Sequence, residues 1–191
     1  MQKIALILLS LALSIYSSLY PPTDPSFEEK IDSFLSSYSK DFDESAERFI
    51  NSKYNDPVLE AHAQSQWKKI ATLKKKVSFK NHYDQKVFQR LFMGFLAFED
   101  AESCESAFQA LIDCLGMSCS KVTWDQEIKG MKTTPFIYIK TETEIIFCKI
   151  KCEHENPFWK EFKHELIENF GVSPSKIIEA GCSGPVSFNE M

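Results

Sequence analysis

Apolar residues recur at helical spacing just after the N-terminal segment of the chain. Five of them share one helix face: Phe27, Ile31, Phe34, Leu35 and Tyr38. Ser26 and Glu29 stand at the spacing of a capping box, in which each side chain accepts a hydrogen bond from the backbone N–H of the other. The pattern therefore predicts a helix that begins after Ser26.

Two more helices are expected before residue 76. Phe42, Phe49 and Ile50 indicate a short second helix, and Asp56-Pro57 is a typical start for a third. The apolar residues of this third helix fall on one face: Leu59, Ala63, Trp67 and Ile70. Residues 19–76 are thus predicted to form an N-terminal helical extension.

The hydrophobic pattern changes after residue 76. Residues 91–98 form a continuous apolar run, which periodicity alone allows to be a buried strand or a helix. Residues 104–114 predict a helix, and residues 136–140 and 144–150 predict a β-hairpin. A last helix follows over residues 157–170, opened by Asn156 and closed by Gly171.

The N-terminus has the composition of a secretory signal peptide. Lys3 supplies a positive charge, and residues 4–16 form an apolar stretch that Ser10 and Ser14 interrupt. This stretch is shorter than the roughly 20 apolar residues of a membrane-spanning helix. We therefore expect residues 1–18 to be a signal peptide that directs the chain into the secretory pathway. The protein would then be secreted or reach the endoplasmic reticulum lumen, and no stable membrane span is expected.

Acidic and basic residues are separated along the chain. Residues 19–60 hold ten acids and four bases, whereas residues 64–90 hold eight bases and one acid, Asp84. The formal net charge of −5 argues against a generic nucleic-acid binder. We interpret the basic segment as a solvated face that the acids partly neutralise, and an intermolecular basic surface is the alternative.

The cysteines all lie in the C-terminal half, and an oxidising compartment favours disulfides between them. They are Cys104, Cys114, Cys119, Cys148, Cys152 and Cys182. The favoured bridge joins Cys152 to Cys182 and would pin a C-terminal tail of residues 171–191. Cys114 with Cys119 and Cys104 with Cys148 would complete one of several pairings that the spacing leaves open.

The order of apolar strand, Cys104 and helix resembles the thioredoxin and protein disulfide isomerase family. Gly130 and Pro135 add a Gly-x-x-x-x-Pro segment ahead of the hairpin and the last helix. In that family the proline is cis and faces the active-site cysteine, so the resemblance makes Cys104 and Pro135 candidate site residues. It covers about residues 77–170 and implies an α/β fold, a thioredoxin-like mixed sheet flanked by helices, with further strands at residues 77–79 and 121–124.

Departures from the family pattern predict that Cys104 is redox-inactive. The family carries Trp-Cys-x-x-Cys, but this chain lacks both the tryptophan and the second cysteine, and Phe98 stands where many members have a buried acid. Four nearby acids should outweigh the helix dipole and raise the pKa of the thiol: Glu99, Asp100, Glu102 and Glu105. Cys104 would then react slowly.

Binding of a protein client is the function that these observations favour. One alternative is a helical, disulfide-stabilised protein in which Phe88, Phe92, Phe95 and Phe98 either pack as core or enclose a site for a lipid or another protein. The other is an active thiol-disulfide oxidoreductase with a resolving cysteine from elsewhere in the chain. No cofactor is predicted, and a set of four residues does not have standard zinc-site spacing: Cys148, Cys152, His154 and His164.

Overall fold

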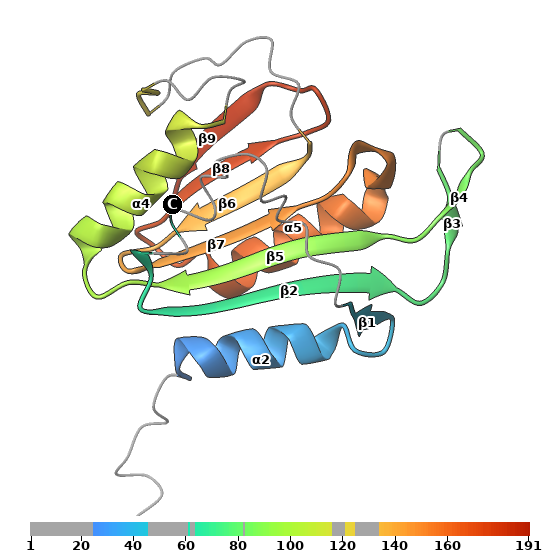
Figure 1. Ribbon diagram of the computed structural model, residues 1–191, viewed down its shortest axis with the longest axis horizontal. Helices are drawn as coiled ribbons and strands as arrows, with labels where there is room; N and C mark the ends of the chain where they lie inside the picture. Colours follow the sequence, from blue (N-terminus) through green and yellow to red (C-terminus); the bar gives the residue numbers. More distant parts are fainter. Residues whose placement is uncertain (1–24, 46–60, 62–63, 82, 116–120, 125–133) are drawn as a thin grey trace, which may run out of the picture. The chain divides into compact units, whose positions relative to one another are not determined.

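A seven-stranded antiparallel sheet with helices makes this an α/β protein (Figure 1). The computed structural model describes residues 25–45, 61, 64–81, 83–115, 121–124 and 134–191. The strands, in spatial order, are β1 (Phe42–Glu44), β2 (Trp67–Lys75), β5 (Arg90–Ala97), β7 (Glu144–Lys149), β6 (Phe136–Lys140), β8 (Lys176–Ala180) and β9 (Val186–Glu190). The helices are α2 (Phe27–Ser37), α4 (Ala101–Asp113) and α5 (Pro157–Phe170), with a short 3-10 helix η1 (Cys152–His154) before α5. A separate small hairpin consists of β3 (Phe79–Lys80) and β4 (Lys86–Val87).

The chain divides into two compact units, residues 1–34 and residues 35–191. Most of α2 belongs to the first unit, and its N-terminus has the predicted capping box. The Ser26 N–H donates to Glu29 Oε2 at 2.8 Å, and the Glu29 N–H donates to Ser26 Oγ at 3.3 Å. Two of the N–H groups at the start of the helix are thereby satisfied. The predicted signal peptide, residues 1–18, lies outside the described residues.

Two helical crossovers give the sheet of the second unit its two-sided cover. α4 leads from β5 to β6, which run in the same direction with β7 inserted between them. α5 leads from β7 to β8 across β6. β7 and β8 run in the same direction as one another and opposite to β5 and β6. Crossovers between strands of like direction are almost always right-handed. Both crossovers move toward β9 along the sheet, but they connect strands of opposite direction. Right-handed connections of this kind place their helices on opposite faces of the sheet, and α4 and α5 lie on opposite faces (Figure 1).

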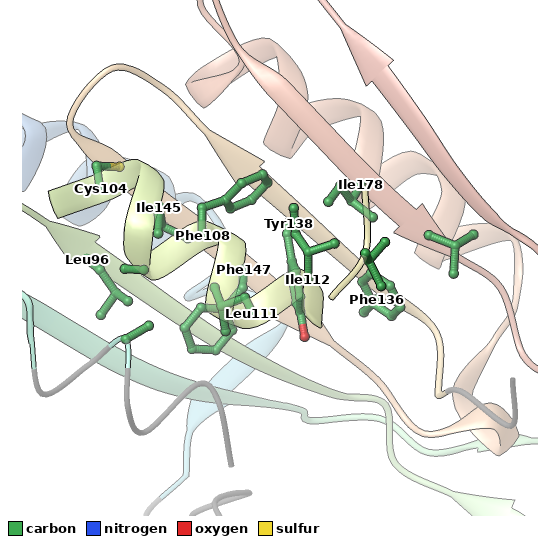
Figure 2. Close-up of a cluster of buried hydrophobic side chains, with 14 of the residues drawn as sticks. Leu96, Cys104, Phe108, Leu111, Ile112, Phe136, Tyr138, Ile145, Phe147 and Ile178 are labelled. Atoms are coloured by element: carbon green, nitrogen blue, oxygen red, sulfur yellow. The ribbon is translucent and has the colours of Figure 1, made fainter. Parts of the chain in front are cut away.

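One face of the sheet packs against α4. Phe108, Leu111 and Ile112 of the helix join sheet residues such as Phe147 and Tyr138 in one buried cluster (Figure 2). Each large apolar side chain buried in this way contributes about 1.5–3 kcal/mol. Because side chains alternate along a strand, every second sheet residue faces α4.

The opposite face packs against α5. The rings of Phe95 and Phe170 lie 5.6 Å apart, and Lys163 forms an ion pair with Glu179. Asn156 caps the helix by accepting a hydrogen bond from the Trp159 N–H at 3.3 Å, as the sequence predicted. Since both faces are covered, β5 is buried on both sides, which explains why residues 91–98 form a continuous apolar run.

The predicted helical extension is wrong at its C-terminal end. Ala61 and Gln64 are helical, but Trp67 and Ile70 belong to strand β2, which pairs with β5 from Trp67 to Lys74. Phe42 lies in strand β1, whereas the other residues of the expected second helix, 49 and 50, fall outside the described part of the chain. Residues 67–75 form a strand despite their helical spacing, because they pair with the apolar strand β5 some twenty residues downstream.

The sheet also differs from the mixed sheet that the family resemblance implied. Each described strand pair is antiparallel. Residues 121–124 form no strand, and residues 77 and 78 precede the short strand β3. Residues 171–191 form more than a tail, because they supply β8 and β9 to the main sheet.

Candidate functional site

Cys104 lies in the first turn of α4, after the strand β5, as the sequence predicted. Asp100 caps the helix by accepting a hydrogen bond from the Ser103 N–H at 2.7 Å, and this bond holds the pKa of Asp100 below its ordinary value. The Cys104 side chain is 0% exposed and lies at one end of the cluster between α4 and the sheet (Figure 2). The thiol therefore has no open path to a substrate.

Burial controls the chemistry of this thiol. Burial raises the pKa of Cys104 from 9.0 to about 12, Lys140 opposes the rise, and Glu144 and Glu105 add to it. The raised pKa confirms the direction predicted from the sequence, but desolvation is the largest cause and the neighbouring acids are secondary. At neutral pH the sulfur is a protonated thiol, which is neither a nucleophile nor a metal ligand.

Cys148 is the second free and fully buried cysteine. It lies on β7 opposite Met93 and Ile137, one residue after Phe147, which packs against α4. Alternation along the strand therefore turns Cys148 toward the face that α5 covers. Cys104 and Cys148 lie on opposite sides of the sheet, so the predicted bridge between them is wrong.

Pro135 does not have the position that the family resemblance implied. Among the described residues the cis peptide bond is Ser173–Pro174, so the bond before Pro135 is trans. Pro135 is buried at the start of β6. Glu105, next to Cys104, pairs with Lys140 at the other end of that strand, at 2.9 Å. A strand of this length spans about 16 Å, so Pro135 does not face Cys104.

The favoured disulfide, Cys152–Cys182, is confirmed. It joins η1 to the turn between β8 and β9, with the two α-carbons 5.2 Å apart. Cys114 is also disulfide-bonded. The partner expected for it, Cys119, lies outside the described residues, so that pairing stays a prediction.

A pocket of about 430 Å³ opens beside the Cys152–Cys182 disulfide. Its lining combines the disulfide, two carboxylates and one aromatic ring: Tyr83, Cys152, Glu153, Glu155 and Cys182. Three segments that are distant in sequence therefore meet here: the β3–β4 hairpin, the end of η1 and the β8–β9 turn.

The turn of the β3–β4 hairpin positions Tyr83. The Asn81 side-chain oxygen accepts hydrogen bonds from the backbone N–H groups of Tyr83 and Gln85, both at 3.0 Å. Asp84 adopts a φ of 59° and pairs with Lys80 at 2.7 Å. A side chain that bonds its own turn in this way holds the backbone in one conformation. The Tyr83 side chain itself stays 69% exposed.

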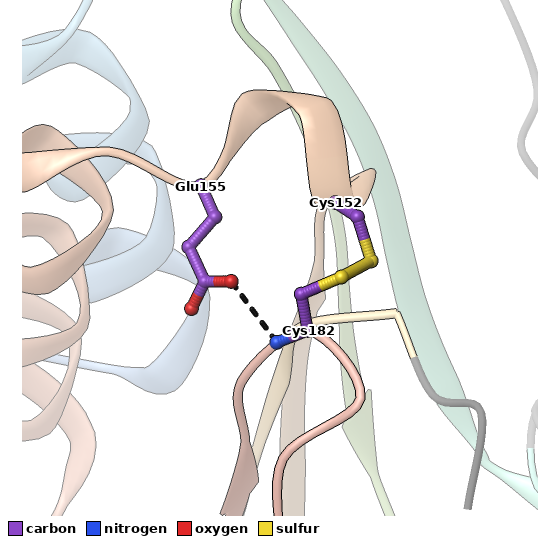
Figure 3. Close-up of a disulfide and its surroundings, with 3 residues drawn as sticks. All are labelled: Cys152, Glu155 and Cys182. Carbon is purple, nitrogen blue, oxygen red and sulfur yellow. Dashed lines mark hydrogen bonds between the residues drawn. A yellow bond between two sulfur atoms is a disulfide. The ribbon is translucent and has the colours of Figure 1, made fainter. Parts of the chain in front are cut away.

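Glu155 ties the disulfide to the other wall of the pocket. Its Oε2 accepts a hydrogen bond from the Cys182 N–H at 3.0 Å (Figure 3). A Cβ at Gly181 would lie 3.1 Å from Glu155 Oε1, so the absence of a side chain there permits this approach. Ser183, directly after Cys182, has a φ of 54°. The pocket is thus bordered by two turns that each hold a non-glycine residue in the left-handed region.

Sequence reasoning found the disulfide but missed the other residues of this pocket. Glu153 lies within η1 and Glu155 directly follows it, and neither belongs to a motif, while Tyr83 is one aromatic in a polar turn. The usable signal was the Asn-x-Tyr-Asp turn at residues 81–84 together with the predicted bridge, which brings residues 153 and 155 next to residue 182. Nothing local in the sequence brings the hairpin to the disulfide.

The described residues contain no group of three or more His, Cys, Asp and Glu side chains that could hold a metal ion. None of the helices in the described part of the chain has the length and apolar character that a membrane crossing requires. A scan of protein-family models finds no match to this sequence, and searches of curated proteins and of solved structures find none either.

Proposed function

We propose that this protein acts in the secretory pathway by binding a protein client, without redox chemistry at Cys104. The observation that carries the proposal is the hairpin arm, residues 77–87, which includes β3 and β4. Four large hydrophobic residues are strongly exposed in the described part of the chain, and two of them, Val77 at 70% and Tyr83 at 69%, belong to this arm. Exposed apolar and aromatic side chains on a projecting, ordered element are typical of contact residues.

The fixed geometry of the arm also supports a binding role. Asn81 and the Lys80–Asp84 pair hold the backbone of the turn, so a client would meet Tyr83 on a turn that is already formed. A turn whose backbone is already ordered loses less conformational entropy on binding than one that must become ordered. The pocket beside Tyr83 adds a concave surface next to the exposed ring.

The two alternative functions have less support. Phe92, Phe95 and Phe98 are 7%, 0% and 5% exposed, so they are core residues, and Phe88 is half-buried with the Lys74 ammonium over its ring. Oxidoreductase activity at Cys104 lacks an accessible thiolate, and Cys148, the other free cysteine among the described residues, faces the opposite side of the sheet. A thioredoxin-like ancestry stays a prediction from the strand, cysteine and helix order, and the antiparallel sheet and trans Pro135 give it no support.

Secretion is proposed on two grounds. The first is the signal-like segment of residues 1–18. The second is the Cys152–Cys182 disulfide, because such bonds persist in oxidising compartments.

Site-specific photo-crosslinking tests the binding proposal. A photoreactive amino acid at position 77 or 83 should capture a client from the secretory pathway, whereas the same group at Val172, which is exposed outside the arm, should not. For the captured client, Tyr83→Ala should weaken the affinity of the purified proteins by at least about tenfold, and Val172→Ala should leave it unchanged. Equal capture at position 172, or an affinity that Tyr83→Ala does not change, would count against the arm as the binding surface.

A further inference from the structure

The Cys152–Cys182 disulfide differs from a buried structural bridge, because it is open to solvent. Both cysteines line the pocket, and Cys182 is exposed on the β8–β9 turn. A thiolate that enters the pocket can therefore reach a sulfur without unfolding of the sheet. Access to the sulfur is one of the factors that set the rate of thiol-disulfide exchange.

The charge around this disulfide is negative. Glu153, which is 43% exposed, and Glu155, which is also exposed, line the same pocket. Lys151 is exposed just before Cys152 but does not line the pocket, and Asp84 beside Tyr83 is paired with Lys80. An attacking thiolate is itself an anion, so the two carboxylates repel it unless the molecule that carries it also brings positive charge.

We propose that the Cys152–Cys182 disulfide is an exchange site selective for a protein or peptide cysteine flanked by lysine or arginine. The flanking cations would pair with the carboxylates of Glu153 and Glu155, while the thiolate attacks the sulfur of Cys182 from the pocket. The charge selectivity of this exchange rests on Glu153 and Glu155 and not on the hairpin arm. It also does not involve Cys104.

The exchange balances in two steps. The partner thiolate attacks Cys182 Sγ, a new S–S bond forms, the Cys152–Cys182 bond breaks, and Cys152 leaves as a thiolate that takes a proton from water. A second partner thiolate then attacks the sulfur of the first, which releases Cys182 as a thiolate that is also protonated. The partner cysteines lose two electrons and become a disulfide, and Cys152 and Cys182 gain them as two thiols.

Matched peptides test the charge selectivity. Two five-residue peptides, one with a cysteine between two lysines and one with a cysteine between two glutamates, are each mixed with the oxidised full chain. Reduction of Cys152 and Cys182 is followed by alkylation and peptide mass spectrometry, and each rate is divided by the thiolate concentration. At about 6 Å in water a carboxylate attracts a unit cation and repels a unit anion by about threefold each, so it contributes about tenfold to the ratio of the two rates. The two carboxylates together should favour the lysine peptide by up to about a hundredfold at low salt.

Charge-neutral variants provide the control. In Glu153→Gln/Glu155→Gln the preference should fall below about threefold, and the amide oxygen at position 155 can still accept the Cys182 N–H. Glu161→Gln/Glu190→Gln removes the same charge from exposed positions outside the pocket and should keep the preference. The preference is the rate with the lysine peptide divided by the rate with the glutamate peptide. Any effect of the carboxylates on the leaving Cys152 thiolate cancels in this ratio, because both peptides displace the same thiolate.

Two results would overturn the proposal. The first is a lysine preference that is the same in the wild type and in Glu153→Gln/Glu155→Gln, since selectivity would then come from elsewhere. The second is a reduction rate that does not depend on peptide concentration, because the disulfide would then react only after the protein unfolds. A salt-sensitive preference that the Glu153/Glu155 variant removes is the expected result.

Discussion

At the scale of single residues, two opposing effects set the pKa of Cys104. The N-terminus of α4 favours a thiolate in its first turn by about 0.3–1 kcal/mol. Burial acts the other way and is larger, because raising the pKa of the thiol from 9.0 to about 12 corresponds to about 4 kcal/mol. The helix dipole is therefore outweighed. A cysteine at a helix N-terminus becomes reactive only where water or a cation can also reach it.

Cys104 should accordingly resist alkylation in the native protein. We expect iodoacetamide at pH 7 to label Cys104 at less than about one hundredth of its rate in denaturant, because the folded thiol is both protonated and 0% exposed. Cys148, also buried, is an internal comparison and should behave alike. Mass spectrometry of the alkylated peptides measures both sites at once. Rapid labelling of Cys104 alone would show that its face of α4 opens.

The sequence allowed only part of the Cys104 environment to be predicted. Its place in the first helical turn follows from local residues, whereas its pKa is raised mainly by burial and only in part by a local acid, Glu105. Its contact with the sheet depends on which way α4 is rotated, and that is set by Phe108, Leu111 and Ile112 packing on distant strands. Glu105 shows the same dependence. Burial raises its pKa, but hydrogen bonds from Lys176 and Lys140 outweigh this and lower it, and neither lysine is near in sequence.

At the scale of elements, Gly94 and Phe147 form a matched pair across β5 and β7. The two residues are opposite one another in the strand register, and Ile70 of β2 is opposite Gly94 on the other side. A Cβ at Gly94 would overlap the Phe147 ring and lie 2.9 Å from Ile70 Cδ1. The missing side chain thus leaves the space that the ring occupies, which gives a glycine in the middle of a central strand a structural role.

Gly94→Ala should therefore destabilise the protein. We expect the free energy of unfolding in urea to fall by about 1–3 kcal/mol, because the ring must move or the strands must separate. Phe147→Leu alone should also cost stability, since it removes buried surface. The double variant Gly94→Ala/Phe147→Leu should lose less free energy of unfolding than the two single variants added together, because the smaller side chain leaves room for the new methyl group. Additive losses would mean that the two positions do not share this space.

Elements with strong local signals were predicted, and β2 was not. The capping box at Ser26, the β6–β7 hairpin and the Asn156 cap of α5 all form as expected. The apolar residues at positions 59, 63, 67 and 70 fit one helix face, and the spacing of three between Trp67 and Ile70 does not match the two-residue period of a strand. The pairing of β2 with β5 is a non-local interaction, which no short window of sequence reveals. The β3–β4 arm was missed for the same reason, because it connects β2 to β5 and is recognised only once these strands are known to pair.

At the scale of the whole molecule, the two crossovers explain why the cysteines divide as they do. The face under α4 holds Cys104, the face under α5 holds Cys148, and the disulfide Cys152–Cys182 sits at the end of the sheet where β7 leaves it. Because the sheet lies between Cys104 and Cys148, these two thiols cannot form a disulfide with one another in the folded protein. The reactive sulfur is left at the edge of the fold, next to the hairpin arm.

His154 joins three parts of this edge. It belongs to η1 between the disulfide and α5, and its ring lies 6.4 Å from that of Phe79 in the arm. The side chain is 1% exposed, and neither ring nitrogen makes a hydrogen bond to another described residue. Burial lowers the pKa of His154 below 6.5, Glu153 opposes this from 3.6 Å, and Lys151 and Arg90 add to it. The folded protein therefore favours the neutral imidazole.

Acidification should then weaken the fold through His154. As the pH falls through 6.5, the unfolded chain takes up a proton at this residue and the folded chain does not, so the free energy of unfolding decreases until the lower pKa of the folded state is reached. Urea unfolding between pH 7.5 and 5.5 should show this decrease in the wild type and a smaller one in His154→Gln, which cannot titrate. His164→Gln, at an exposed position on α5, should keep the wild-type slope. If His154→Gln retains that slope as well, the pH dependence arises elsewhere and the buried imidazole does not report on the stability of this edge.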